Sequence, residues 1–263
     1  MRIATWNVNS VKQRVDNAVA WLNERQPDIV CLQETKCVDE AFPREPFEAA
    51  GYNVVVHGQK GFNGVALLSK VPFDEVTPRL AGDDDDPQAR FLEGLVSTRA
   101  GVLRVATIYL PNGNPPEGEK YTYKIDWMDR LIRYARERLA HEEPMVLAGD
   151  YNVIPSELDA RNPAAWTTDA LFLPRTRQRF RTLRALGLTD ALRAGSDAGG
   201  LYTFWDYQEG AWQKNNGIRI DHILLSPQAA DRLVRVDIDR HVRAWEKPSD
   251  HVPVVAELSL EPR

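Results

Sequence analysis

Short apolar runs recur along the chain, and several of them end in a group of polar residues. Residues 3–6, 29–32 and 145–148 are runs of this kind, long enough for a buried strand and too short for a helix. β-Branched and aromatic residues predict further strands over residues 52–57, 64–69, 90–98, 102–110, 202–205, 217–226 and 252–260. The pattern is that of a strand-rich protein.

Helical spacing of apolar residues appears between these strands. Ser10 is placed as the N-cap of a helix that runs to about Arg25. Residues 121–139 predict a long helix, and the basic segment 175–184 predicts another. Two strand-rich halves, each with helices, predict two β-sheets packed face to face and covered by helices. At 263 residues and 43% hydrophobic composition, we expect a single domain over residues 1–263.

Two segments are expected to lie outside regular structure. Residues 82–87 include four consecutive aspartates and predict a solvated turn, because carboxylates that repel one another are costly to bury. Residues 156–174 predict a long loop, and Trp166 and Phe172 make this loop too aromatic for a plain linker.

Composition narrows the class of protein. No apolar run approaches the roughly 20 residues needed to span a bilayer, and the first residues lack the apolar core of a signal peptide. Cys31 and Cys37 are the only cysteines and have no nearby histidine, so we interpret them as reduced thiols. These features predict a cytoplasmic protein without a membrane partner.

Charge limits how the protein could bind a polyanion. A net charge of -5 argues against binding through the whole surface. A local basic surface is possible, because a helix over residues 175–184 would place Arg177, Arg181 and Arg184 on one face. That face is either a nucleic-acid contact or a solvated helix surface, and the sequence favours neither.

Polar side chains suited to chemistry follow five of the predicted strands. Gly, Asp and Asn are the commonest turn residues, so the stretch GDYN (149–152) alone would indicate an ordinary turn. The full set is more specific, and it comprises Asn7, Glu34, Tyr109 with Asn112, Asp150 with Asn152, Asp250 with His251, and Asp221 within a strand. Oxygen ligands without cysteine suit Mg²⁺ or Mn²⁺. A divalent cation beside one histidine fits phosphate-ester hydrolysis.

These polar groups lie in motifs that resemble those of the exonuclease III family of the endonuclease/exonuclease/phosphatase superfamily. The matching stretches run nearly end to end: TWNVNS (5–10), LQETK (32–36), YLPNG (109–113), GDYNV (149–153), GIRIDHILLS (217–226) and SDHVP (249–253). The resemblance implies a four-layered α/β sandwich, with two packed β-sheets flanked by helices. It also implies one divalent cation, Mg²⁺ with Mn²⁺ as a substitute, and double-stranded DNA as substrate.

The resemblance implies which residues hold the metal. Glu34 and Asp250 would bind it directly, with Asn7 nearby. The residues expected at or around the metal are Asn7, Glu34, Asp150, Asn152, Asp250 and His251.

Catalytic roles follow from the same resemblance. Asp150 would activate or orient the attacking water, and Asn152 would hold the phosphate. His251 would stabilise the charge of the developing phosphorane and would be oriented by Asp221, as a carboxylate orients imidazole in many hydrolases. The resemblance leaves open which of Asp150, Tyr109 and His251 handles protons.

Substrate contacts are expected on both sides of the phosphate. Tyr109 and Asn112 would touch the phosphate itself. Abasic endonucleases of this family often carry a tryptophan in the GIRID segment, whereas this chain has Ile218 there. An extruded baseless sugar would therefore meet an apolar lining, and further contacts would come from the basic helix; the residues concerned are Phe204, Ile218, Ile220, Arg177 and Arg181.

The expected function is that of a DNA phosphodiesterase of base-excision repair. It would act as a 3′-to-5′ exonuclease on duplex DNA, as an abasic-site endonuclease and in the cleaning of blocked 3′ ends. We expect a cytoplasmic monomer, associated with the nucleoid when it acts on DNA. Two alternatives are a superfamily phosphatase acting on lipid or inositol phosphates, and a nucleic-acid-binding regulator without catalysis. The complete set of acidic motifs argues against the second.

Overall fold

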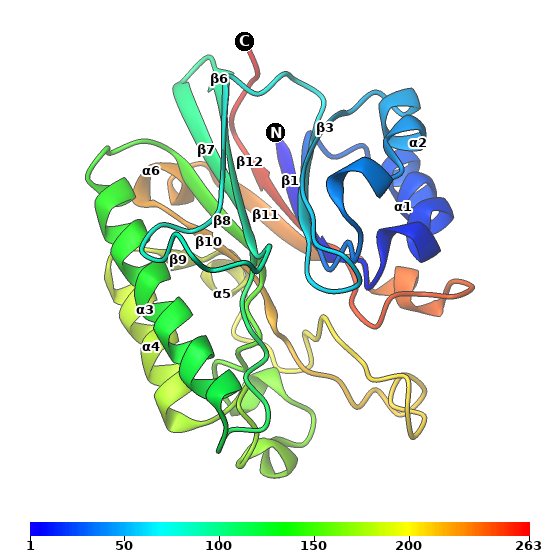
Figure 1. Ribbon diagram of the computed structural model, residues 1–263, viewed down its shortest axis with the longest axis vertical. Helices are drawn as coiled ribbons and strands as arrows, with labels where there is room; N and C mark the ends of the chain where they lie inside the picture. The colour runs from blue at the N-terminus through cyan, green and yellow to red at the C-terminus, as the bar shows by residue number, and fades with distance from the viewer.

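Two six-stranded β-sheets form the centre of the protein, whose computed structural model describes residues 1–263 (Figure 1). The first sheet has the order β11-β12-β1-β2-β4-β3, and its strands are β1 (Arg2–Asn7), β2 (Ile29–Gln33), β3 (Asn53–His57), β4 (Val65–Ser69), β11 (Leu233–Ile238) and β12 (Val254–Leu258). The second has the order β5-β6-β7-β8-β10-β9, and its strands are β5 (Glu75–Pro78), β6 (Phe91–Thr98), β7 (Gly101–Tyr109), β8 (Met145–Asp150), β9 (Thr189–Asp190) and β10 (Asp221–Leu225).

Helices cover both outer faces of the paired sheets (Figure 1). The first sheet is covered by α1 (Val11–Arg25) and α2 (Arg44–Ala49), and the second by α3 (Glu119–Leu139) and α4 (Pro174–Ala185). The remaining helical segments are α5 (Ala191–Gly195), α6 (Pro227–Ala230), η1 (Asp39–Ala41), η2 (Glu157–Asp159), η3 (Pro163–Trp166) and η4 (Arg240–Ala244). The predicted four-layered sandwich is confirmed. No helix has both the length and the apolar character that crossing a bilayer requires.

Apolar side chains fill each of the three spaces between the four layers. Alternate residues of both sheets meet in the middle, among them Ile3, Val105, Val146 and Ile223. This alternation follows from the two-residue period of a strand, which sends neighbouring side chains to opposite faces. Burying one such side chain contributes about 1.5–3 kcal/mol, so this middle layer holds the two sheets together.

Strand register places the polar strand ends beside one another. In the second sheet, β7 and β8 run parallel and pair Tyr109 with Asp150, while antiparallel β10 pairs Asp221 with Asp150. In the first sheet, parallel β1 and β2 end together at the pair Asn7 and Gln33. The loops that follow these strands gather at one end of the sandwich, the lower end in Figure 1, away from both chain termini.

The segment 202–205 is not a strand, contrary to the sequence-based prediction. Phe204 forms isolated bridges to Ile218 on one side and to His251 on the other. Thr203 and Trp205 add hydrogen bonds to the same two motifs, so the segment is held between GIRID and SDH without forming a regular strand. The aromatic side chains that suggested a strand instead pack in the apolar clusters at this end of the sandwich.

Ser10 occupies the N-cap position of α1, as predicted, but its side chain does not cap the helix. Its backbone has φ 79° and ψ 105°, and its side chain makes no capping hydrogen bond. Its N–H instead donates to the carbonyl of Glu34 at 2.8 Å. The start of α1 is therefore fixed by the end of β2.

The acidic turn is solvated only in part. Three of its four aspartates are exposed, whereas Asp86 is buried. Its carboxylate accepts hydrogen bonds from Arg130 and from the hydroxyl of Tyr123, each at 2.8 Å. The partner charge offsets the cost of burying a carboxylate, and no local pattern indicates a partner 44 positions away.

Several short elements carry no clear pattern in the sequence. They are β5, β9, β11 and α2, which either lie at sheet edges or cover a few residues. Strand β11 is partly exposed along its length and mixes charged with apolar residues. Edge strands of this kind lack the apolar run that identified the central strands.

Candidate active site

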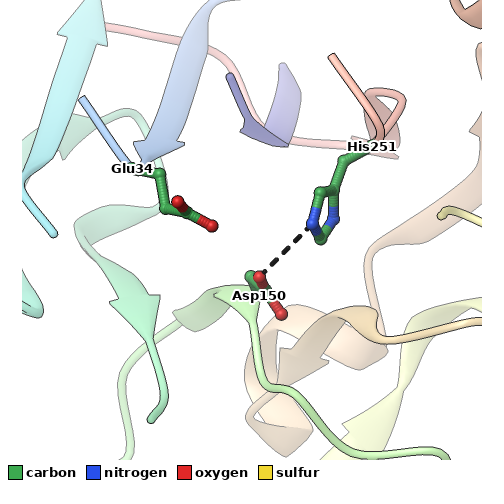
Figure 2. Close-up of side chains that lie close together, drawn as sticks. All are labelled: Glu34, Asp150 and His251. Atoms are coloured by element: carbon green, nitrogen blue, oxygen red, sulfur yellow. Dashed lines mark ion pairs between the residues drawn. The ribbon is translucent and has the colours of Figure 1, made fainter. Parts of the chain in front are cut away.

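Two carboxylates and one imidazole meet at the end of the sandwich where the polar strand ends gather (Figure 2). Glu34 follows β2, Asp150 ends β8, and His251 lies just before β12. One ligand atom from each side chain lies within 4.8 Å of the others. The cluster thus joins the two sheets, with Glu34 and His251 from the first and Asp150 from the second.

The amide of Asn7 holds the two carboxylates in place. Its Nδ2 donates to Glu34 at 2.8 Å and to Asp150 at 2.9 Å. Its Oδ1 accepts from the backbone N–H of Asn9 at 3.0 Å, which fixes the direction of the amide group. Ser249 donates to the carbonyl of Asn7 at 2.7 Å and so ties the SDH motif to β1.

His251 is oriented by a carboxylate from another strand. Its Nδ1 lies 2.8 Å from Asp221, and its Nε2 lies 3.6 Å from Asp150. The ring of Phe204 packs edge-on against the imidazole at a centroid distance of 5.0 Å. Burial disfavours the charged ring, but the carboxylates of Asp221 and Asp150 outweigh it and raise the pKa of His251 well above its ordinary value. His251 is therefore an imidazolium whose Nε2 points at the cluster.

The other titratable groups of the cluster differ in protonation. Burial, opposed by the charge of His251, raises the pKa of Asp150 to about 7. Burial also disfavours the charge of Glu34, yet the hydrogen bond from Asn7 helps to hold its pKa below the ordinary value. Burial and the charges of Glu34 and Asp150 raise the pKa of Tyr109 well above its ordinary value. The surroundings thus favour the charged form of Glu34 and, relative to free side chains, the protonated forms of Tyr109 and Asp150.

Two asparagines border the cluster. The backbone N–H of Asn152 donates to Asp150 at 3.0 Å, and its Nδ2 donates to the carbonyl of Leu110 at 2.8 Å. Asn112 follows the end of β7, and its Oδ1 accepts from Nδ2 of Asn114 at 2.9 Å. Both carboxamides are therefore fixed by the protein before any substrate arrives.

A cavity of about 310 Å³ opens over the cluster. Its polar floor includes Glu34, Tyr109, Asn112, Asp150, Asn152 and His251. Its apolar wall is made by Trp166, Leu171, Phe204, Ile218 and Ile220. A polar floor that faces an apolar wall suits a ligand with a charged group at one end and a sugar-like body at the other.

Three of the residues singled out in the sequence lie apart from the cluster. Asp250 lines the same cavity, but its carboxylate is not among the three ligand groups that lie within 4.8 Å. Arg177 stacks on the ring of Phe172 at 4.4 Å, and Arg181 is exposed on α4. Neither arginine lines the cavity.

Several residues of the site could not be identified from the sequence. Trp166, Asp169 and Leu171 line the cavity and come from the long loop before α4. The aromatic content of that loop indicated that it is more than a linker, but not that it reaches the site. The guanidinium of Arg90 lies 4.9 Å from the centre of the Tyr109 ring. Lys124 lies beneath the cavity floor, on α3. Each owes its place to tertiary packing.

The donor set fits a hard divalent cation. Glu34 and Asp150 present carboxylate oxygens at close range, and such oxygens are the ligands that Mg²⁺ and Mn²⁺ prefer. No cysteine is present in the cluster, which argues against a structural zinc site.

Comparison with known proteins gives consistent results. Residues 4–251 match the model of the Endonuclease/Exonuclease/phosphatase family. The chain is 37% identical over 266 residues to exodeoxyribonuclease III of Haemophilus influenzae, covering 98% of this chain and 100% of that protein. A 3′ phosphatase from Neisseria, NExo, solved with a product DNA hairpin, is 38% identical, with a TM-score of 0.94 over 98% of this chain and 99% of that one.

An AP endonuclease from Archaeoglobus fulgidus is also similar, with 36% identity and a TM-score of 0.93 over 98% of this chain and 99% of that one. The similarity covers both sheets and every motif of the cluster. The chain therefore belongs to the endonuclease/exonuclease/phosphatase family and, within it, to the exonuclease III group.

Proposed function

We propose that this protein is a divalent-metal-dependent DNA phosphodiesterase of base-excision repair. It would remove nucleotides from 3′ ends of duplex DNA, cut at abasic sites and clear blocked 3′ ends. The observation that carries the proposal is the cluster of half-buried Glu34 with buried Asp150 and His251, and with Asp221 behind the imidazole. The relatives include a DNA exonuclease, a 3′ phosphatase and an AP endonuclease, and this range agrees with the proposal.

In the proposed mechanism, the phosphate enters between His251 and the two asparagines. Asp150 orients a water and accepts its proton as the new O–P bond forms. The P–O3′ bond then breaks, and the leaving oxygen takes a proton from solvent water to become the 3′ hydroxyl. The imidazolium of His251 and the phenol of Tyr109 donate hydrogen bonds to the oxygens on which charge develops. A Mg²⁺ or Mn²⁺ ion held at Glu34 and Asp150 would supply neutralisation of the phosphate charge. His251 would act on the phosphate, because its Nδ1 is held by Asp221 and its Nε2 carries a proton.

The apolar wall would receive the sugar next to the cleaved phosphate. Phe204, Ile218 and Ile220 line that wall. A sugar without a base can leave the duplex at low cost, because most of the stacking has already been lost. The remaining DNA would be held by local basic residues and not by the net charge, which is -5. We further propose that the protein acts as a monomer in the cytoplasm, on the nucleoid.

One experiment tests the proposed function. The purified protein is incubated with Mg²⁺ and three labelled duplexes: blunt-ended, ending in a 3′ phosphate, and containing an abasic site. We expect cleavage of all three, and no turnover of inositol phosphates or lipid phosphates offered in parallel. Binding without cleavage would support the inactive regulator, and turnover of only the non-nucleic phosphates would support the other alternative.

Substituting one carboxylate should expose the need for a metal. Glu34→Gln keeps the shape of the side chain and removes one anionic ligand. We expect cleavage at sub-millimolar Mg²⁺ to fall by about two orders of magnitude or more, with partial recovery as Mg²⁺ is raised. Glu40→Gln, an exposed carboxylate of η1, is a matched control. Full activity of Glu34→Gln at low Mg²⁺ would contradict its role as a ligand.

The basic face of α4 should contribute to holding DNA. Replacing Arg177, Arg181 and Arg184 together by alanine is expected to raise KM and to lower the slope of log KM against log salt by up to about 3, because each lost phosphate contact reduces that slope by about 1. Turnover should change less. A salt dependence identical to that of the unaltered protein would show that the helix face is merely solvated.

A further inference from the structure

Lys124 is a buried cation that the proposed mechanism does not use. It lies in α3, on the face turned toward the second sheet, and its side chain is 0% exposed. It takes part in no ion pair within 4 Å. Burying an ammonium group without a paired carboxylate lowers stability, whereas a methionine of similar length would not. Packing alone therefore does not account for a lysine here.

The two hydrogen bonds of Lys124 go to the cavity floor. Its Nζ donates to the carbonyl of Asn152 at 2.6 Å and to the carbonyl of Asn112 at 3.0 Å. These residues follow the ends of β8 and β7, so one side chain joins the two loops that border the cluster. Burial lowers the pKa of Lys124 to about 7, and either protonation state has the N–H donors that both bonds require.

Both bonds hold backbone in uncommon conformations. Asn152 has φ 48°, in the left-handed region, and Gly113, directly after Asn112, has φ 87°. A Cβ at Gly113 would lie 2.6 Å from Cδ of Lys124, so the stem of the lysine packs directly against this turn. At a residue other than glycine, left-handed backbone persists only where its surroundings over-determine it, and Lys124 supplies part of that restraint at Asn152.

We propose that Lys124 is a positioning residue that fixes the carboxamides of Asn112 and Asn152 where they contact the phosphate. Asn114 donates to the side-chain amide of Asn112, and the amide of Asn152 donates to the carbonyl of Leu110. These two bonds fix the rotation of each amide group about its side chain, but not the position of the backbone that carries it. The distance between the two amides depends on the backbone, and the bonds from Lys124 set it. This inference rests on the proposed function, which places the phosphate between them.

The test is a double-mutant cycle on the abasic-site duplex. Lys124→Met keeps the length of the side chain and removes its donors. We expect kcat to fall about 10²-fold with KM changed little, because a displacement of about 1 Å at a reacting group can cost that much. In an Asn112→Ala/Asn152→Ala background, the same change should cost less than about threefold, because both groups that Lys124 positions have gone.

Arg130→Met is the matched control. Arg130 is also a buried cation of α3, and it donates to the carbonyls of Leu80 at 2.6 Å and Ala81 at 3.3 Å, away from the cluster. We expect Arg130→Met to lower Tm without lowering kcat per folded molecule. If Lys124→Met does not fold, Lys124→Gln keeps a neutral donor and enters the same cycle.

An unchanged kcat in the lysine variants, or equal costs with and without the two asparagines, would overturn the positioning role. An unaltered protein that cleaves none of the three duplexes would instead overturn the proposed function. The two failures are thus distinguishable, because the first requires an unaltered protein that is active.

Discussion

Asp150→Asn is expected to lower turnover on abasic-site DNA by about 10³-fold, within the range for loss of a general base. The amide keeps the shape of the side chain, and its single oxygen can still accept from Asn7, but it loses the hydrogen bond from the backbone N–H of Asn152 and cannot accept a proton from water. Steady-state cleavage at saturating Mg²⁺ measures the effect. Asp129→Asn, on the outer helix α3 and paired with Arg179 at 3.2 Å, provides a control for removal of a carboxylate elsewhere.

The same variant should not lose stability. The folded-state pKa of Asp150 is raised to about 7, above its ordinary value of 3.8, so the native state holds this proton more tightly than the unfolded chain. The carboxylate therefore destabilises the fold increasingly as pH rises from about 4 to 7, and a neutral amide removes that effect. In metal-free buffer at pH 8, Tm of the variant should equal or exceed that of the unaltered protein. A strongly lowered Tm would show that lost activity reflects lost folding.

Two aspartates beside the histidine should respond differently when each is changed to asparagine. Asp250 lines the cavity, and Asp250→Asn should be partly rescued by raised Mg²⁺ if this carboxylate is a metal ligand. Asp221 contacts Nδ1 of His251 at 2.8 Å, and Asp221→Asn should lower turnover by about 10²- to 10⁴-fold without rescue by metal.

The pH dependence separates these two roles. The carboxylate of Asp221 helps to raise the pKa of His251, so its loss lowers that pKa and the imidazolium disappears at a lower pH. The alkaline limb of kcat/KM should accordingly move to lower pH in Asp221→Asn and move less in Asp250→Asn, because the charge of Asp250 raises the pKa of His251 less than Asp221 does. Rescue of Asp221→Asn by Mg²⁺, with its pH profile unmoved, would reverse the two assignments.

Much of the fold could be predicted because central strands have a distinct pattern. Runs such as residues 145–148 are apolar on both faces, since each sheet is covered by the other sheet and by helices. Elements at the margins could not be predicted in the same way. Strand β11 is paired on one side only, and residues 202–205 owe their conformation to contacts with two segments distant in sequence.

The residues of the candidate site likewise fall into those that the sequence could identify and those that it could not. Side chains at strand ends were visible in the sequence because a polar group after an apolar run stands out, and His251 lies against Asp221 and Asp150 in the structure. Lys124 could not be found that way, because a lysine within a helix is usually solvated. Its burial depends on two loops that fold over it from other parts of the chain.

The pairing of β1 with β12 has a consequence for synthesis of the enzyme. Strand β1 lies between β12 and β2, and Trp6 donates to the carbonyl of His251 at 3.1 Å. A chain emerging from the ribosome therefore carries Glu34 and Asp150 long before it can place His251 against them. Domains generally fold as units during synthesis, and a chain that has not yet reached residue 251 lacks the imidazole that completes the cluster. A nuclease built in this way gains the last group of its active site only after both sheets have received most of their strands.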